Sequence, residues 1–323
     1  MAGSSGSGEP HVIVVGGVNI DIGGRSFSPL VAGDSNPGRV TVSLGGVGRN
    51  IAHNLSLLNV RVSMLTALGS DLYAQRVLAS CAETGIDIRR ALIVPDAATS
   101  TYIYLDDCDG DMALALSDME ICDRITPVYL ERNLDLLRSA DLIVLDANIP
   151  AESVEWIADR CTAPLFADPV STKKAEKFRP VLGRLHTLKP NRLEAELLSG
   201  VRITDRESLL RAAEALLDTG LKRVFVTLGS EGVLAAGEEG FFSLPCFAAE
   251  IRNTTGAGDA FMAALVWAYL EGYSAERACR AASAASALAV ESSETVNPAL
   301  SPEALRRRME SARKNENARS EQA

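Results

Sequence analysis

Residues 253–259 read Asn-Thr-Thr-Gly-Ala-Gly-Asp and lead into an apolar run from 260 to 270. This pattern predicts the start of a helix, at which Thr254 or Thr255 could cap free backbone N–H groups. The N–H groups of residues 256–258 would then face outward at the positive end of the helix dipole. Such a helix start predicts an anion site, suited to a phosphate or to charge that develops on one.

Asp259 stands directly beside this predicted anion site. A carboxylate there repels a bound anion, unless its task is to take a proton from an attacking hydroxyl. The alternative is that Asp259 only complements the helix dipole in the first turn. Taken with the glycines that precede it, the carboxylate favours phosphoryl transfer with Asp259 as the base.

Polar side chains follow several apolar runs that predict strands. Asn19 and Asp21 stand at alternate positions after the run 11–16, where an open α/β sheet binds its ligands. An Asx-turn that closes the strand explains these two residues equally well. Later in the chain, polar residues again stand at predicted strand ends: Asp146, Asn148, Asp168, Lys189, Asn191 and Thr227. Helix capping explains some of them, but polar residues at so many strand ends favour one shared crevice.

Two glycine-rich segments offer further room for a ligand. Residues 45–50 read Gly-Gly-Val-Gly-Arg-Asn, but a dinucleotide-binding loop would need a glycine where Ile51 stands. We therefore predict a close backbone approach to a ligand at a helix start, with an Asn50 amide that can donate and accept. Residues 229–232 read Gly-Ser-Glu-Gly, which predicts either a plain hairpin turn or a turn that holds nucleotide phosphates.

Strands and helices must alternate to bring these residues together. Short apolar runs predict strands at 11–16, 61–68, 141–146, 164–168, 187–189, 223–228, 233–236 and 240–249. Amphipathic patterns predict helices at 71–84, 127–138, 151–160, 172–182, 192–198, 206–217 and 274–290. Repeated βα units of this kind indicate an α/β fold with a doubly wound, mostly parallel sheet flanked by helices.

Two segments interrupt this alternation. Residues 23–44 and 100–117 contain extended runs joined by turns, which predicts a small β-sheet that acts as a lid over the site. We expect one domain over residues 11–305, a flexible tail over 1–10 and a charged C-terminal tail over 306–323.

The composition narrows the class of partner. With 32 Lys and Arg against 42 Asp and Glu, the net charge of −10 argues against nucleic acid or an anionic membrane. Six scattered cysteines without a C-x-x-C pair argue against zinc and for free thiols in a reducing cytosol. Without a membrane-spanning run or a signal peptide, we expect a cytoplasmic protein, or one in an organelle whose targeting segment is not in this chain.

The glycine-rich segments 45–48 and 254–259, in this order, resemble the two motifs of the ribokinase-like (PfkB-type) kinases over residues 11–298. That family transfers phosphate from ATP to a hydroxymethyl group of a sugar or nucleoside, so the resemblance implies ATP and Mg²⁺. Residues 191–194 match its N-x-x-E motif, which tunes Mg²⁺ and phosphate binding. The family usually has an aspartate where this chain has Asn253, beside a monovalent-cation site, so K⁺ activation stays open.

The resemblance also implies a role for each candidate site residue. Asp259 would be the base, and the anion hole would consist of Gly256, Ala257 and Gly258. The acceptor would be bound by Asn19, Asp21, Ser43, Gly45, Gly46, Asn50, Thr101 and Asn148. ATP would lie along Lys189, Asn191, Thr227, Gly229 and Gly232, and Mg²⁺ would be held, through water, by Glu194 and Asp168.

Four stretches, 34–38, 43–52, 145–148 and 167–171, resemble the pseudouridine kinases within this family. The resemblance implies phosphorylation of the 5′-hydroxyl of pseudouridine. The alternatives are a kinase for another nucleoside or sugar, such as adenosine, inosine or ribose, and a nucleoside-binding protein of the same fold without catalysis. Because exposed sheets of this family often pair between subunits, a homodimer through the lid is a further expectation.

Overall fold

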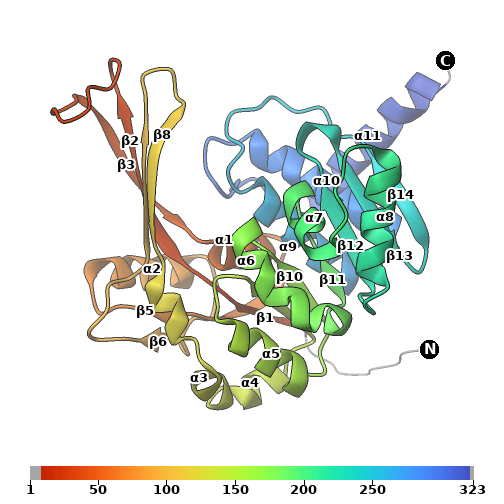
Figure 1. Ribbon diagram of the computed structural model, residues 1–323, viewed down its shortest axis with the longest axis horizontal. Helices are drawn as coiled ribbons and strands as arrows, with labels where there is room; N and C mark the ends of the chain where they lie inside the picture. Colours follow the sequence, from red (N-terminus) through yellow and green to blue (C-terminus); the bar gives the residue numbers. More distant parts are fainter. Residues whose placement is uncertain (1–8, 321–323) are drawn as a thin grey trace.

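Eight strands form the central sheet in the described part of the chain, and helices cover both of its faces (Figure 1). The computed structural model describes residues 9–320, with side chains described as far as Arg313. The strands lie in the order β14 (Gly240–Leu244), β13 (Val233–Gly237), β12 (Arg223–Thr227), β11 (Thr187–Leu188), β10 (Leu165–Asp168), β9 (Leu142–Asp146), β1 (His11–Val15) and β4 (Arg61–Leu65). All neighbours from β12 to β4 are parallel, whereas β12, β13 and β14 pair as antiparallel hairpins.

The parallel strands are buried on both faces, which is why their sequences are apolar in succession rather than in alternation. Val12 and Val14 of β1 belong to one hydrophobic cluster, whereas Ile13 and Val15 belong to the other. The first cluster includes residues of α1 (Val47–Leu57), α2 (Leu72–Glu83), α9 (Ala257–Leu270) and α10 (Ala275–Val290), and the second includes residues of α5 (Ala151–Arg160), α7 (Arg192–Ser199) and α8 (Arg206–Leu217). The predicted doubly wound, mostly parallel sheet is therefore confirmed.

Some predicted elements are shorter or divided, each for a local reason. The helix predicted at 127–138 is divided into α3 (Pro127–Glu131) and α4 (Leu134–Arg138) at Asn133, whose side chain donates to a backbone carbonyl. The helix predicted at 172–182 is α6 (Thr172–Ala175) followed by a 3₁₀ helix, η2 (Glu176–Arg184), which contains Pro180. The strand predicted at 240–249 ends before Pro245, which cannot continue the ladder of hydrogen bonds.

The last helix, α11 (Pro302–Ser320), continues through most of the segment predicted as a charged tail over 306–323. Its first residues pair with the body, since Arg306 contacts Glu271 at 3.2 Å and Arg308 contacts Glu291 at 2.7 Å. The tail predicted over 1–10 falls mainly on residues 1–8, which together with 321–323 lie outside the described residues. Among the helices that the structure describes, none has the length and apolar character needed to cross a membrane.

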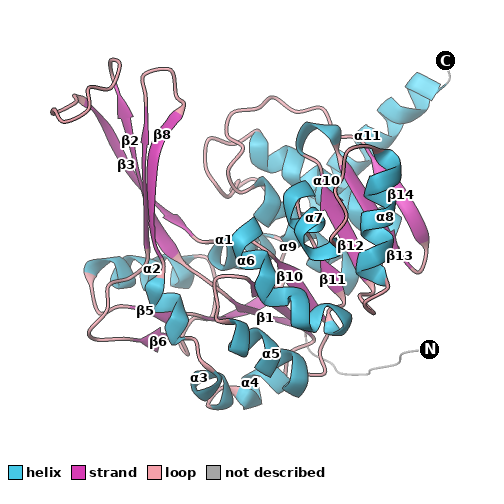
Figure 2. Ribbon diagram, viewed as in Figure 1, coloured by secondary structure: helices cyan, strands magenta, loops and turns pink. Residues whose placement is uncertain are grey.

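A second, smaller sheet projects from the body (Figures 1 and 2). This small sheet has the strand order β3 (Gly38–Gly45), β2 (Asn19–Ser26), β7 (Thr101–Asp106) and β8 (Met112–Asp118). The middle strands β2 and β7 are parallel, and each pairs with an antiparallel outer strand. The separate sheet is confirmed, but it begins at Asn19, so Asn19 and Asp21 belong to it rather than to the end of β1.

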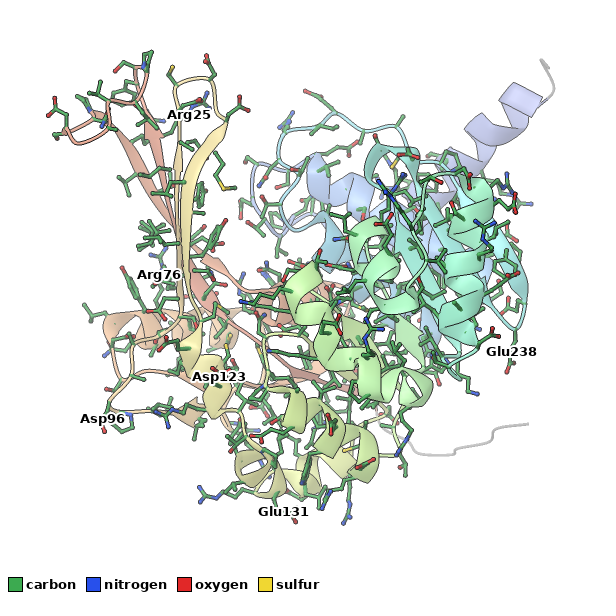
Figure 3. All side chains as sticks on the ribbon, viewed as in Figure 1. Arg25, Arg76, Asp96, Asp123, Glu131 and Glu238 are labelled. Carbon is green, nitrogen blue, oxygen red and sulfur yellow. The ribbon has the colours of Figure 1, made fainter. Side chains whose placement is uncertain are left out.

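The small sheet is anchored to the body at one end and free at the other. Figure 3 shows Arg25 near the free end and Arg76, on α2, closer to the body. The Arg76 side chain donates to the carbonyl oxygen of Val42 at 3.1 Å and so links α2 to β3.

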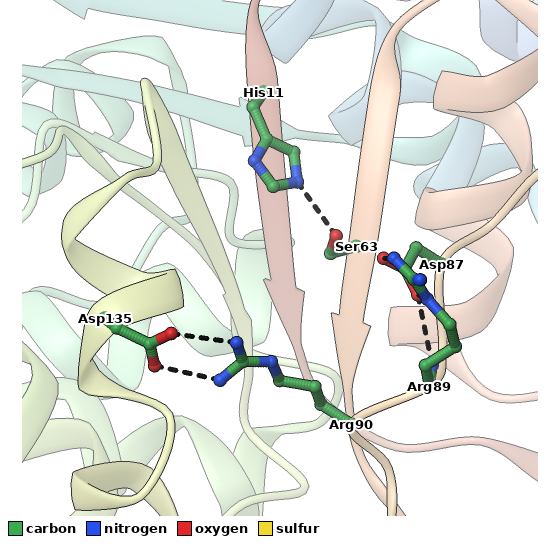
Figure 4. A network of polar contacts seen from close by, with 6 residues as sticks. All are labelled: His11, Ser63, Asp87, Arg89, Arg90 and Asp135. Carbon is green, nitrogen blue, oxygen red and sulfur yellow. Dashed lines mark hydrogen bonds and ion pairs between the residues drawn. The ribbon is translucent and has the colours of Figure 1, made fainter.

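Figure 4 shows polar contacts around β1 and β4, with His11 at the start of β1 and with Arg90 and Asp135 near the carboxyl ends of the two strands. His11 Nε2 and Ser63 Oγ share a hydrogen bond of 2.8 Å between β1 and β4. Arg90 donates to both carboxylate oxygens of Asp135 at 2.8 Å, but both side chains are exposed, so the pair stabilises the fold little. We interpret these contacts as structural.

Candidate functional site

The winding direction of the sheet reverses between β1 and β9. The chain passes from β1 to β4 on one side, and β9, β10, β11 and β12 follow on the other. Open α/β sheets bind ligands at such a switch point, beyond the carboxyl ends of the strands. Gly17, which follows β1, and Asp146, the last residue of β9, meet at this point.

Asp146 joins three segments of the chain at the switch point. Its buried carboxylate accepts the backbone N–H groups of Gly17, Gly48 and Asn148, each at 2.8 Å. Burial raises the pKa of Asp146, whereas the hydrogen bonds from Asn148 and Gly17 lower it. The sequence places Asp146 at a strand end, but its contact with the first turn of α1 depends on the tertiary fold.

The start of α1 requires glycine. Gly46, the N-cap residue, has φ +97°, and a Cβ there would lie 2.6 Å from the carbonyl oxygen of Gly17. Because Gly46 has no side chain that could cap the helix, the Asp146 carboxylate binds the Gly48 N–H instead. This helix start, which the sequence predicts, places Asn50 in the first turn of α1.

The start of α9 differs from the prediction in its cap. Capping by Thr254 or Thr255 is wrong, because the N-cap is Gly256, which has φ +83° and no side chain. A Cβ on Gly256 would overlap the carbonyl oxygen of Thr295, so this turn also requires glycine. The predicted helix start is confirmed, and the first turn of a helix leaves N–H groups without intrahelical acceptors.

Asp259 lies in that first turn with its carboxylate against α1. The Asn50 Nδ2 group donates to Asp259 Oδ2 at 2.8 Å, and both side chains are buried. Burial and the Asp168 carboxylate raise the pKa of Asp259 to about 7, although Asn50 and Lys189 lower it. A carboxylate with this pKa can take up and release a proton near neutral pH, as a general base must.

Lys189 brings a positive charge to the same first turn. Its Nζ pairs with Asp168 Oδ2 at 3.1 Å, with both side chains buried, and lies 3.3 Å from the position of a Cβ on Gly258. Burial lowers the pKa of Lys189, but the carboxylates of Asp168, Glu194 and Asp259 outweigh burial and raise it. The absence of a side chain at Gly258 therefore leaves the ammonium group facing the helix start.

The predicted nucleotide residues form a second group next to Lys189. Asn191 and Glu194 form a capping box at the start of α7, in which Asn191 N donates to Glu194 Oε2 at 2.8 Å. Thr227 forms a β-bridge with Asn191, and Gly229 follows it in a 3₁₀ turn with φ +60°. Within the described residues, no group of three or more His, Cys, Asp and Glu is placed to hold a metal ion directly.

Gly232, the last residue of that second group, ends the turn between β12 and β13. Gly232 has φ +102°, and a Cβ there would overlap the carbonyl oxygen of Leu244 at the end of β14. The turn that the sequence predicts at 229–232 is therefore confirmed, and it connects the antiparallel strands β12 and β13.

The predicted acceptor residues gather at the base of the small sheet. Asn19 Nδ2 donates to Asp21 Oδ1 at 2.6 Å, and Gly45 leaves the room that the Asp21 carboxylate occupies. Ser43 pairs with Asp21 across β2 and β3, so the two side chains share a face. Thr101 pairs with Ile20 and therefore lies on the opposite face of the sheet.

Three residues near the site carry no role in the prediction from sequence. Tyr102 pairs with Asp21 across β2 and β7, so its side chain lies on the same face of the small sheet as Asp21, whereas that of Thr101 does not. Arg49 is buried beside Asn50, and its charge lowers the pKa of Asp21, which burial raises. Lys174 donates to Asn148 Oδ1 at 2.6 Å. Arg49 directly follows a glycine-rich segment, which was a usable signal, whereas the positions of Tyr102 and Lys174 depend on strand register and on tertiary contact.

Known proteins resemble this chain in sequence and in fold. The sequence pattern of the pfkB family of carbohydrate kinases matches residues 9–302. The pseudouridine kinase of Escherichia coli is 41% identical over 295 residues, which cover 90% of this chain and 94% of that enzyme. A carbohydrate kinase from Agrobacterium tumefaciens has a TM-score of 0.80 and 30% identity, covering 93% of this chain and 97% of that one. The ribokinase of Thermotoga maritima has a TM-score of 0.81 and 25% identity, covering 94% and 99%.

Proposed function

Because the chain belongs to the pfkB family of carbohydrate kinases, we propose that it phosphorylates the 5′-hydroxyl of pseudouridine with ATP, giving pseudouridine 5′-phosphate and ADP. The chain is an ATP-dependent phosphotransferase that acts on a hydroxyl group. One observation carries the chemistry: Asn50 holds the Asp259 carboxylate at the start of α9. The identity with a pseudouridine kinase along nearly the whole chain supports the choice of acceptor.

Asp259 is the proposed general base. Its carboxylate accepts the proton of the attacking hydroxyl, and its pKa of about 7 leaves it about half ionised at neutral pH. The Asn50 amide orients it through the 2.8 Å hydrogen bond. In this proposal the backbone N–H groups of Gly256, Ala257 and Gly258, with Lys189 beside them, would stabilise the negative charge that develops on the phosphate, although the Ala257 N–H also makes a long bond of 3.5 Å to the carbonyl oxygen of Thr254.

The residues present fit a nucleotide. The α9 start and the Lys189 ammonium suit its phosphates, and Asn191, Thr227, Gly229 and Gly232 would lie along the rest of it. Glu194 and Asp168 already bind protein groups, so they would hold Mg²⁺ through the water molecules that this ion keeps. When bound, Mg²⁺ neutralises charge on the phosphates.

The K⁺ requirement depends on Asn253. Its Oδ1 accepts the Thr255 N–H at 2.9 Å, and an amide has no charge with which to attract a cation. Turnover measured in potassium and in tetramethylammonium chloride, at equal ionic strength, tests whether a monovalent cation contributes.

A competition assay tests the acceptor. The enzyme is given ATP, Mg²⁺ and equal concentrations of pseudouridine, uridine, adenosine, inosine and ribose, and each phosphorylated product is quantified. Pseudouridine should be consumed first, because a site that pairs the hydroxyls and base edge of one acceptor rejects others. If another acceptor is phosphorylated as fast as pseudouridine or faster, the chain is still a kinase but pseudouridine is not its preferred substrate. If no phosphorylated product forms at all, the proposed catalysis is refuted.

We further propose that the small sheet is a lid that also pairs two copies of this chain. Strand register gathers one apolar face on it, with exposed fractions such as 68% for Val40 and 63% for Leu116. The face consists of cross-strand rows of Val42, Ile22, Ile103 and Leu116, and of Val40, Leu105 and Leu114. An identical second copy can cover such a face by twofold symmetry.

Light scattering at several protein concentrations tests the dimer. Leu116→Glu should shift the particle toward the monomer, because it places a charge within the apolar face. Ala115→Glu is the matched control, since the neighbouring residue of a strand points to the other face. A wild-type protein that is monomeric at every concentration would refute the proposed dimer and would not affect the proposal that the small sheet is a lid.

A further inference from the structure

Lys174 reaches the acceptor end of the site through Asn148. Its Nζ lies 2.6 Å from the side-chain oxygen of Asn148, which follows β9 and is 6% exposed. Asn148 packs against Gly17, and Gly17 in turn contacts Gly46 at the start of α1. The backbone at Gly17 therefore lies between the Asn148 side chain and the start of α1. Nothing in the sequence pattern connects Lys174 with this part of the site.

The contact fixes which way the Asn148 amide points. A lysine ammonium group has three donors and no acceptor, so the amide must turn its oxygen toward Lys174. Its Nδ2 group then faces the other way, 2.8 Å from the position of a Cβ on Gly17. The amide therefore offers donors to its surroundings, not its oxygen.

The position of Asn148 decides what part of an acceptor it meets. The reacting hydroxyl must lie at Asp259, which Asn50 contacts from the first turn of α1. Asn148 lies across Gly17 from that helix start, beside Met119, which follows β8 of the small sheet. An acceptor whose reacting hydroxyl lies at Asp259 would therefore have its other end toward Asn148. In a nucleoside phosphorylated on its 5′-hydroxyl, that end is the base, at the edge remote from the glycosidic bond.

We propose that Lys174 is a positioning residue that holds the Asn148 amide as a hydrogen-bond donor to the remote carbonyl oxygen of the base, an inference that rests on the proposed function. Uracil has such a carbonyl. A base with an amino group at that edge presents a donor to a donor and leaves both groups unpaired. The Lys174–Asn148 pair therefore selects keto bases over amino bases.

Calorimetric binding of two matched ligands tests this selection. Pseudouridine carries the remote carbonyl, and pseudoisocytidine carries an amino group in its place. The wild type should bind pseudouridine tighter by about 10- to 100-fold, the range expected for one unpaired buried polar group. Lys174→Met frees the amide to turn, so the ratio should fall to within about threefold of one, and Lys174→Arg should restore it because arginine also only donates.

Lys177→Met is the matched control. Lys177 donates to the carbonyl oxygens of Ala147 and Ile149 at 3.0 and 2.8 Å, so it holds the same loop without touching the amide. This variant should keep the keto-over-amino ratio of the wild type. Equal loss of the ratio in both methionine variants would overturn the proposal, because only the loop would then matter. A wild-type ratio near one would overturn it as well.

Two further readouts keep the outcomes distinct. Should Lys174→Met not fold, Asn148→Asp replaces the donor by an acceptor and should invert the ratio; an unchanged preference for pseudouridine refutes the inference. Turnover separates it from the proposed function. Selective binding of pseudouridine without its phosphorylation supports the positioning role of Lys174 and refutes pseudouridine as the phosphate acceptor. Phosphorylation of both ligands at equal efficiency refutes the positioning role alone.

Discussion

Asp259→Asn tests the chemistry most directly, because it removes the ionisable group and keeps its shape. Burial and the Asp168 carboxylate raise the pKa of Asp259 from 3.8 to about 7. Loss of a positioned general base typically costs ~10²–10⁴-fold in rate. We expect kcat to fall by that factor, while the dissociation constant of the nucleoside changes little.

The same substitution should stabilise the fold. The unfolded chain ionises Asp259 near pH 3.8 and the folded chain only near pH 7, so wild-type stability falls as pH rises through this window. The full penalty is about 4 kcal/mol, because one pKa unit corresponds to ~1.36 kcal/mol. Asparagine is neutral at every pH, so the gain in stability should be about 3 kcal/mol greater at pH 8 than at pH 5.

Urea unfolding at pH 5 and pH 8 measures the stability gain, and steady-state kinetics measures the rate. Wild-type kcat/KM should rise about tenfold between pH 6 and pH 8 as Asp259 ionises, and this rise should vanish in the variant. Near-normal turnover of the variant would show that Asp259 is only a charge at a helix start. An equal stability gain at both pH values would refute a buried carboxylate that titrates near neutrality.

Three further substitutions and one control test the surroundings of this carboxylate. Gly256→Ala should lower both kcat and stability, because the φ of Gly256 is +83° and the added Cβ overlaps a carbonyl oxygen. Gly272→Ala is its control: Gly272 has φ +70° and open space around it, so this change should cost only about 1 kcal/mol of stability and leave turnover unchanged. Asn50→Ala removes a hydrogen bond that lowers the pKa of Asp259, so the rise in kcat/KM should move to higher pH, and a rise that stays in place would contradict the contact. Lys189→Met leaves its buried carboxylate partner unpaired and should cost about 3–5 kcal/mol in urea unfolding, and a loss below 1 kcal/mol, as for an exposed ion pair, would show that the charge is solvated.

Much of the fold follows from the sequence, because strands covered on both faces must be apolar throughout, as residues 11–15 are. The boundaries that differ depend on single residues. Asn133 divides one predicted helix, and Pro245 follows the last residue of β14. These are local effects that a pattern averaged over a whole element does not contain.

The candidate site was predictable where it is local and unpredictable where it is not. The glycines before Asp259 stand next to it in the chain, so their spacing alone predicts a helix start with a carboxylate. The contact between Asn50 and Asp259 spans 209 positions and needs the topology. The face on which Thr101 or Tyr102 lies depends on strand register, in which a shift of one residue exchanges the two faces.

The contacts at the switch point also bear on biosynthesis. β1 lies between β4 and β9, so a nascent chain that ends before residue 142 exposes one unpaired edge of an apolar strand. Until α9 has left the ribosome, the first hydrophobic cluster lacks one of its principal helices and Asn50 lacks its partner. The growing polypeptide therefore exposes apolar surface to chaperones until α9 is complete, and interrupted translation should yield fragments prone to aggregate rather than partly active enzyme.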